Sequence, residues 1–288
     1  MKFFTSFALL TLATTISAEE EIQVAYHENV GIPEASRIKD VEEQTSPVQT
    51  RIVGGLGSFM GEHPFFGGLI ITLTDGQISV CGSSLISNWR IVTAAHCYYD
   101  GYYQAYSMLV VLGSVRLFSG GTRVSATSIV VHPSFNPVTV QNDVAVLNIP
   151  YVASTSYVKP IALPAGFQLT NDFVGYRAEA IGFGKTSDSD TITTSVSLRD
   201  VFVDVISNAG CQVAYGGLVT TSHMCTSGAG GRNPCGGDSG GPLILYSSTG
   251  DDLLIGIITY GSSSGCAAGL PTVHTRVTSH AAWIRSQL

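Results

Sequence analysis

Three side chains capable of acyl-transfer chemistry stand in distinctive local settings in this sequence. Ser239 lies in the run CGGDSGGP, where the glycines allow backbone angles and close approaches that side chains would block. His96 lies in the run TAAHC, whose small residues leave room around an imidazole. Asp143 precedes the apolar run VAVL, where a buried carboxylate is costly unless it has a partner.

Hydrolysis of an amide by a serine needs a nucleophile, a base, a group that orients the base, and donors for the oxyanion. Ser239, His96 and Asp143 fit the first three roles. Each alone has an ordinary explanation, as a loop serine, a satisfied core histidine and a turn cap. Each motif occurs once, in the order His, Asp, Ser, and the combination predicts a catalytic site.

Composition indicates the kind of fold that must position these residues. Hydrophobic residues make up 44% of the 288 positions and charged residues 12%, with 32 glycines, as is typical of a compact, turn-rich β protein. The formal net charge is −7, and no cluster of lysine and arginine occurs. We therefore expect no nucleic-acid partner.

The N-terminus, residues 1–18, has the order of a secretory signal peptide: a lysine, a short apolar run and small residues at its end. The alternative is a membrane anchor, which needs about 20 apolar residues, whereas threonines and serines interrupt this run. We expect secretion and no membrane partner. Secretion favours disulfides among the six cysteines, which allow 15 pairings by sequence alone. A metal site is the other reading, but no Cys-x-x-Cys or His-x-x-x-His spacing is present.

Residues 19–51 form an acidic segment with eight carboxylates, three basic residues and no cysteine. The segment ends at Arg51, before Ile52-Val-Gly-Gly, where a trypsin-like protease could cut. We expect an activation propeptide that nothing covalent retains after cleavage. The alternative is a solvated tail with an incidental arginine.

The remaining chain shows short β-rich runs separated by turn residues, which predicts an antiparallel sandwich or barrel. These runs include Leu69–Thr72, Ser107–Leu112, Ser128–Val131 and Leu253–Thr259. A helix is expected at the C-terminus, with Ser279 as its cap.

Residues 52–288 resemble the chymotrypsin-like (trypsin-fold) serine endopeptidases, closest in character to digestive enzymes of insects. The resemblance rests on IVGG at 52–55, TAAHC, Asp143 with its context, GFG at 182–184, GDSGGP at 237–242 and the C-terminal Trp283-Ile284. It implies an all-β fold of two six-stranded antiparallel β-barrels with the active site between them, and a C-terminal helix. The barrels would span about 52–160 and 165–288.

The resemblance also implies roles for single residues. Ser239 would attack the scissile carbonyl, His96 would act as general base and then acid, and Asp143 would hold the tautomer of His96. The backbone amides of Gly237 and Ser239 would form the oxyanion hole.

Two further features follow from the resemblance alone. Cleavage after Arg51 would free the ammonium of Ile52 to pair with Asp238, beside the nucleophile. The disulfides would be Cys81 to Cys97, Cys211 to Cys225 and Cys235 to Cys266.

By position in this family, the substrate pocket comprises Asn233, Pro234, Thr259, Tyr260, Gly261 and Thr272. Trypsins carry an aspartate where this chain has Asn233, so cleavage after Lys or Arg is not expected. Gly261 favours a large P1 residue (the residue before the cut bond), and Thr272 resembles elastase-like members. We expect apolar or aromatic P1 residues, with an elastase-like preference for small residues as the alternative. Residues 259–261 would pair with the substrate as an added strand.

We expect no cofactor and no metal, because the stretch 116–125 that binds calcium in some relatives holds no carboxylate. The expected partners are protein and peptide substrates, an activating trypsin-like protease and protein protease inhibitors, and the expected state is a monomer. After residue 51 the chain has two lysines against eight arginines, a bias that resembles digestive members of this family from insects with an alkaline gut lumen; the alternative is ordinary compositional drift. The rivals are a non-catalytic homologue acting as a binding protein, and a regulatory protease of a defence or clotting cascade.

Overall fold

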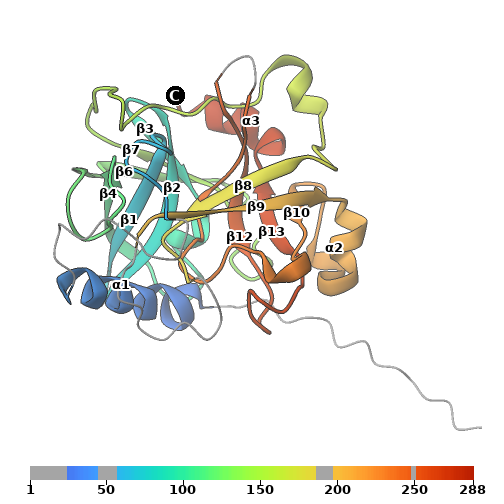
Figure 1. Ribbon diagram of the computed structural model, residues 1–288, viewed down its shortest axis with the longest axis horizontal. Helices are drawn as coiled ribbons and strands as arrows, with labels where there is room; N and C mark the ends of the chain where they lie inside the picture. The colour runs from blue at the N-terminus through green and yellow to red at the C-terminus, as the bar shows by residue number, and fades with distance from the viewer. Residues whose placement is uncertain (1–24, 45–56, 186–196, 248–250) are drawn as a thin grey trace, which may run out of the picture.

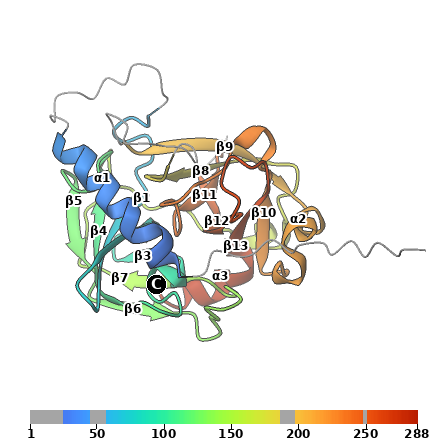
Figure 2. The same ribbon diagram turned by 90° about the horizontal axis from the view of Figure 1, so that it is seen from below.

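The structure is a computed structural model that describes residues 25–44, 57–185, 197–247 and 251–288. The predicted signal peptide, Arg51 and Ile52 lie outside these residues. In the described part, two antiparallel β-sheets stand side by side (Figures 1 and 2). The expected class, all-β with barrel-like sheets and a C-terminal helix, is confirmed.

The first sheet has the strand order β5-β4-β1-β2-β3-β7-β6. Its strands are β1 (Phe66–Leu73), β2 (Ile78–Ser87), β3 (Arg90–Thr93), β4 (Ala105–Leu112), β5 (Thr122–Ser125), β6 (Ser128–Val131) and β7 (Ala145–Asn148). This sheet has seven strands where six were expected, because one strand is divided by a bend. The amide of Ala126 still bonds to Met108 on β4, at 2.9 Å, whereas that of Thr127 bonds to Asn148 on β7, at 2.8 Å. Two residues thus connect the two ends of the sheet, which curls round on itself.

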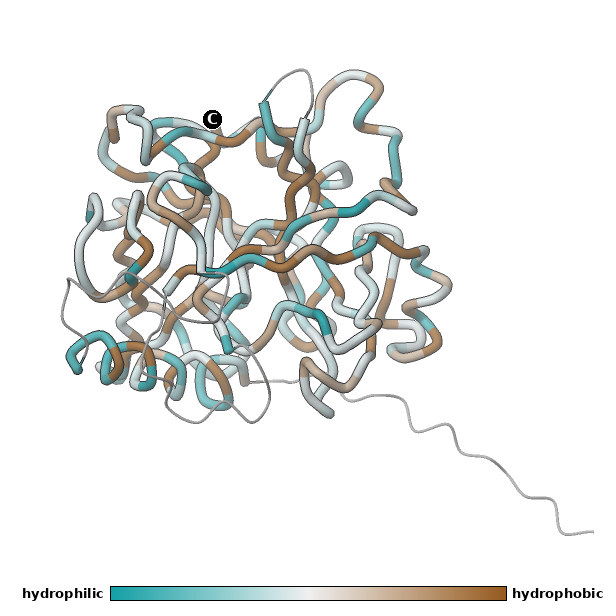
Figure 3. Tube along the Cα trace, viewed as in Figure 1, coloured by the Kyte–Doolittle hydropathy of each residue, from teal (hydrophilic) through white to brown (hydrophobic). Residues whose placement is uncertain are grey.

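The second sheet is a closed barrel with the order β10-β13-β12-β11-β8-β9. Its strands are β8 (Arg177–Gly182), β9 (Arg199–Ile206), β10 (His223–Thr226), β11 (Pro242–Leu245), β12 (Leu253–Tyr260) and β13 (Thr272–Arg276). The four β-rich runs predicted from the sequence lie within β1, β4, β6 and β12. Apolar residues line the strands, while polar residues concentrate in the connections (Figure 3).

Among the described residues, three α-helices lie outside the sheets: α1 (Ile32–Gln44), α2 (Asn208–Tyr215) and α3 (Val277–Arg285). The helix at the C-terminus was expected, but the cap at Ser279 was wrong. The chain passes from β13 directly into α3 at Val277, which is buried, and the Ser279 hydroxyl instead contacts the carbonyl of Thr221 at 3.4 Å. In the described part of the chain, no helix is long and apolar enough to cross a membrane.

The two sheets touch through backbone at the loop that carries Ser239. The amide of Gly82 on β2 donates to the carbonyl of Ser239 at 2.7 Å. A Cβ atom on Gly82 would lie 2.7 Å from the Cα of Gly241, and one on Gly240 would lie 2.6 Å from the carbonyl oxygen of Gly82. The glycines of this loop therefore serve close approach between the sheets.

Candidate active site

His96 and Asp143 meet in a buried pair on the first sheet. His96 lies in a short 3₁₀ turn (Ala95–Cys97) after β3, and Asp143 lies just before β7, the neighbour of β3. One carboxylate oxygen of Asp143 accepts the backbone amide of His96 at 2.8 Å, and the other lies 2.7 Å from Nδ1. Asp143 is fully buried, so both of these contacts offset the loss of hydration.

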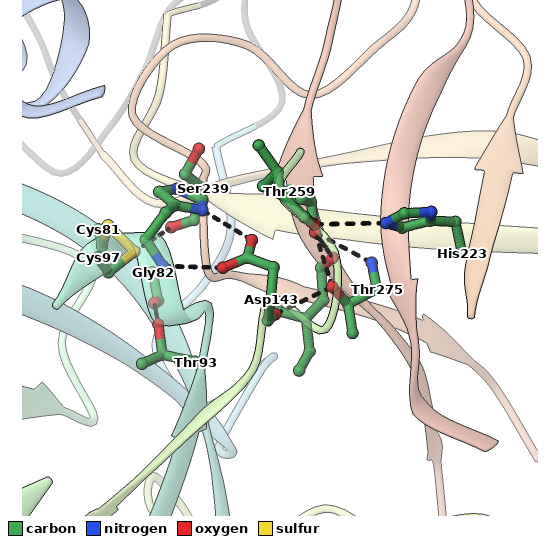
Figure 4. Close-up of polar contacts among 12 residues, drawn as sticks. Cys81, Gly82, Thr93, Cys97, Asp143, His223, Ser239, Thr259 and Thr275 are labelled. Atoms are coloured by element: carbon green, nitrogen blue, oxygen red, sulfur yellow. Dashed lines mark hydrogen bonds and ion pairs between the residues drawn. A yellow bond between two sulfur atoms is a disulfide. The ribbon is translucent and has the colours of Figure 1, made fainter. Parts of the chain in front are cut away.

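The second barrel holds the backbone of Asp143. The hydroxyl of Thr275 on β13 donates to the carbonyl of Asp143 at 2.9 Å, and it lies 3.1 Å from the hydroxyl of Thr259 on β12 (Figure 4). Thr259 in turn accepts the amide of Thr275 at 3.0 Å. This buried pair of hydroxyls joins the backbone of Asp143 to the second barrel.

The pairing of His96 with Asp143 determines which imidazole nitrogen carries the proton. With a carboxylate at Nδ1, that nitrogen carries the proton, and Nε2 is left as an acceptor. Nε2 of His96 is buried and has no hydrogen-bond partner among the described residues. A hydroxyl placed there would find a base, which is the arrangement a serine nucleophile needs.

Ser239 belongs to the second barrel, where it lies in the turn before β11. Gly237 adopts a φ of +100°, which residues with side chains rarely adopt. The structure joins Cys235 to Cys266 beside this loop and Cys81 to Cys97 beside His96, and it joins Cys211 to Cys225. These are the pairs that the family resemblance implies, and two of them brace the site.

The carboxylate of Asp238 lies against Gly182 and Gly184, at the end of β8. Its carboxylate accepts the amides of Gly184 at 2.7 Å and Cys235 at 2.8 Å. Burial raises its pKa to about 6, although both amides and the positive charge of Arg37 act in the opposite direction. The predicted pairing of this carboxylate with Ile52 lies outside the described residues.

The six predicted pocket residues line one cavity together with Ser239. These residues are Asn233, Pro234, Thr259, Tyr260, Gly261 and Thr272. The Asn233 amide donates to the carbonyls of Cys266 at 3.0 Å and Leu270 at 2.9 Å, and its oxygen accepts the hydroxyl of Thr272 at 3.0 Å. The polar groups at this position are therefore neutral and satisfied. The described residues that line the cavity include Lys185 and no carboxylate.

Residues before Arg51 also enter the site, which the sequence did not predict. Tyr26, Asn29 and Val30 line the same cavity. The ring of Tyr26 lies 4.8 Å from that of His96, and its phenol donates to the carbonyl of Val80 at 2.8 Å in the cavity that Ser239 also lines. Burial, together with the negative charge of Glu34, raises the pKa of Tyr26, which therefore stays protonated. No motif in the sequence marks Tyr26.

Two groups of side chains in the described residues have the proximity that metal binding needs. In the first, His96 lies beside Cys81 and Cys97, whose sulfurs form a disulfide and are not thiolates. The second contains Glu62, His63 and Asp200. Its carboxylates already accept protein donors, from the Phe59 amide at 2.7 Å and the Ser58 hydroxyl at 3.1 Å respectively.

Two barrel-like β-sheets, with a buried His–Asp pair on the first and a serine in a glycine-rich turn on the second, define the class of two-barrel serine endopeptidases. The family model described as Trypsin matches residues 52–284, and the chain belongs to that family.

Similar proteins and a solved structure agree with this assignment. The chain is 39% identical over 236 residues to a collagenase from Hypoderma lineatum, covering 82% of this chain and 86% of that one. It is 37% identical over 240 residues to brachyurin from Leptuca pugilator, with coverages of 82% and 98%. A solved structure of HL collagenase superposes with a TM-score of 0.74 at 39% identity, covering 82% of this chain and 98% of the other. The chain is accordingly a serine endopeptidase.

The His96–Asp143 pair generates a prediction. Asp143→Asn keeps the shape but replaces an acceptor with an amide that can donate to Nδ1, which places the imidazole proton on the wrong nitrogen. We expect kcat to fall about 10⁴-fold. The measurement is hydrolysis of a peptide substrate after activation, with thermal unfolding as the control for folding. Activity within about tenfold of the unchanged chain would contradict this role for Asp143.

Proposed function

We propose that this protein is a secreted zymogen, activated by cleavage after Arg51, that hydrolyses peptide bonds after apolar or aromatic residues. Residues 1–18 would be the signal peptide, residues 19–51 the propeptide and residues 52–288 the protease domain. The observation that carries the proposed specificity is the neutral, fully bonded Asn233 in the cavity beside Ser239.

In the proposed mechanism, Ser239 attacks the carbonyl carbon of the scissile bond while Nε2 of His96 takes its proton. The amides of Gly237 and Ser239 stabilise the oxyanion, and His96 then protonates the leaving amine. Water repeats the sequence on the acyl-enzyme. Asp143 keeps Nδ1 protonated and stabilises the imidazolium, which the two short contacts of its carboxylate support.

Specificity follows from the charges and the width of the pocket. A lysine or arginine at P1 would enter a site with Lys185 at its lining and no carboxylate among the described residues, so burial of its charge would be uncompensated. Thr272 narrows the same pocket, because a Cβ on Gly261 would lie 3.8 Å from the Thr272 hydroxyl. This narrowing is the observation that favours the elastase-like alternative, a preference for small P1 residues.

Activation would place a positive charge beside Asp238. Its carboxylate is buried, with its pKa raised to about 6, and a new ammonium at Ile52 would stabilise its ionised form. We propose an extracellular location, since three disulfides suit an oxidising compartment. Digestion in a gut lumen, an activating trypsin-like protease, protein inhibitors as partners and a monomeric state complete the proposal.

The proposal predicts the outcome of controlled activation. Residues 19–288 are cut after Arg51 with immobilised trypsin, the trypsin is removed, and p-nitroanilide peptides with Phe, Leu, Ala or Arg at P1 are compared. We expect the highest kcat/KM with Phe or Leu, and a loss of at least about 10³-fold in Ser239→Ala. Native collagen is a further substrate to test, because one relative is named a collagenase.

The controls separate the rival functions. Arg51→Gln should remain uncut at this bond and inactive. Cleavage mainly after Ala would make the enzyme elastase-like, and dominant cleavage after Arg would refute the pocket assignment. Correct cutting without any activity would favour a non-catalytic binding protein.

The width of the pocket gives a second prediction. Thr272→Gly removes the side chain that faces Gly261, and should raise kcat/KM for Phe relative to Ala by about tenfold. Thr272→Ser is the matched control, because it keeps the hydroxyl that bonds Asn233 and removes the methyl group. The ratio should change less in this variant. An unchanged ratio in both variants would show that Thr272 does not limit the P1 residue.

A further inference from the structure

Residues 25–44, here called the docked segment, pack against the protease domain along their whole length. They form a π-helical turn (His27–Gly31) followed by α1 (Ile32–Gln44), which lies along the outside of the first sheet (Figures 1 and 2). One face of α1 is buried at helical spacing, and Ile38 on that face is 0% exposed. The described part of the N-terminal region is therefore not a solvated tail.

The first contact lies at the catalytic residues. Tyr26 packs edge-on against His96, donates its hydroxyl to the carbonyl of Val80 at 2.8 Å, and lines the same cavity as Ser239. The segment thus places a phenol in the cavity that Ser239 lines. A phenol offers no carbonyl carbon to attack, so it occupies this cavity without presenting a bond to cut.

Next to Tyr26, His27 fixes the turn. Its backbone amide donates to Asp100 at 2.8 Å, and its Nδ1 lies 2.8 Å from the Ser79 hydroxyl. The side chain is fully buried. Val30 follows one turn later and reaches the Ser239 loop, where a Cβ on Gly236 would lie 3.2 Å from its Cγ1.

The second contact is ionic and lies beside the proposed oxyanion hole. Glu34 is 1% exposed and pairs with Arg37 at 2.8 Å and Lys185 at 3.3 Å. A Cβ on Gly237 would lie 3.4 Å from Glu34 Cγ. Arg37 also donates to the carbonyl of Phe183 at 3.3 Å. The negative charge of Glu34 raises the pKa of Asp238, and the positive charge of Arg37 lowers it. The segment therefore places both an anion and a cation near the carboxylate with which Ile52 is proposed to pair.

The third contact lies at the far end of α1. The buried carboxylate of Glu42 accepts the amides of Leu117 and Phe118 and, at 2.8 Å, the hydroxyl of Ser119. Arg116 pairs with the same carboxylate at 3.4 Å. A carboxylate with this many donors is a specific anchor, because a buried charge without them would be costly.

From these contacts we propose that the docked segment is a reversible inhibitor that binds the cleft of the cleaved enzyme as a separate peptide. None of the three contact sites includes Arg51, and the segment has no cysteine to retain it. The protein surface it fits consists of the Ser239 cleft, Lys185 and the 116–119 loop, which together suit an acidic amphipathic helix with tyrosine at its start. Inhibition by this segment rests on the proposed function, because it requires an active enzyme, whereas binding of the segment does not.

A synthetic peptide of residues 25–44 tests the inference. The chain 19–288 is cut after Arg51, the immobilised trypsin and released fragments are removed, and the peptide is added back. We expect competitive inhibition with a Ki of about 10 μM or tighter. Tyr26→Ala and Glu42→Gln peptides should each raise Ki at least about tenfold. Lys39→Gln is the matched control, because Lys39 is 58% exposed and pairs only with the exposed Glu43 among the described residues; its Ki should change less than about twofold.

Direct binding separates failure of this inference from failure of the proposed function. Fluorescence anisotropy of a labelled peptide reports binding to the cut protein whether or not it hydrolyses substrates. Binding without activity would refute the proposed function and leave the docking intact. Activity without binding, or equal Ki values for the Tyr26→Ala and unchanged peptides, would overturn the inference.

The pH dependence provides an independent check through His27. Burial lowers the pKa of the docked His27 to about 4, and the charge of His96 acts in the same direction, while Asp100 and Asp75 oppose it. A free peptide histidine titrates near 6.5, so docking expels a proton between these two values, and acid weakens binding. The rise in Ki from pH 8 to pH 5 should be about tenfold larger for the unchanged peptide than for His27→Gln. Identical pH profiles would show that His27 is not buried in the complex.

Discussion

The rest of the site depends on the burial of one carboxylate. Asp143 has no access to solvent, so its charge is tolerable only because His96 supplies two donors and the second barrel fixes the backbone beside it. This requirement couples the two sheets. Thr275 and Thr259, which belong to the second barrel, determine where a residue of the first barrel lies. The geometry of the imidazole is therefore a property of the interface between the barrels.

The same interface explains why glycines surround the nucleophile. The Ser239 loop crosses β2 so closely that Gly82 and Gly241 are in backbone contact. Two disulfides, Cys81–Cys97 and Cys235–Cys266, hold the chain on either side of this crossing. Tight backbone packing and covalent links together limit the positions that the serine can take, and this rigidity suits a site that must stabilise a transition state.

Much of this arrangement could be predicted from the sequence because it is encoded locally. His96, Asp143 and Ser239 each lie in a short, distinctive stretch of sequence. The six pocket residues were assigned from their positions relative to Ser239 in the pattern of the family. The bend at Ala126 and Thr127 could not be predicted, since it depends on which neighbouring strand each amide meets. The docked segment was missed for a related reason. Glu34 and Glu42 look like solvent-exposed charges in the sequence, and only the donors on distant loops make their burial favourable.

The lack of cysteine in the docked segment has a consequence for when the enzyme works. Before the cut, the segment and the cleft belong to one chain, so their effective concentration is high and independent of how much protein is present. After the proposed cut, the fraction of enzyme with a bound segment would fall on dilution, since each enzyme would meet only the segments released around it. At high protein concentration the partly cleaved enzyme would stay inhibited. The same sample would become active on dilution into a larger volume. Total protein concentration, and not cleavage alone, would then set the onset of proteolysis.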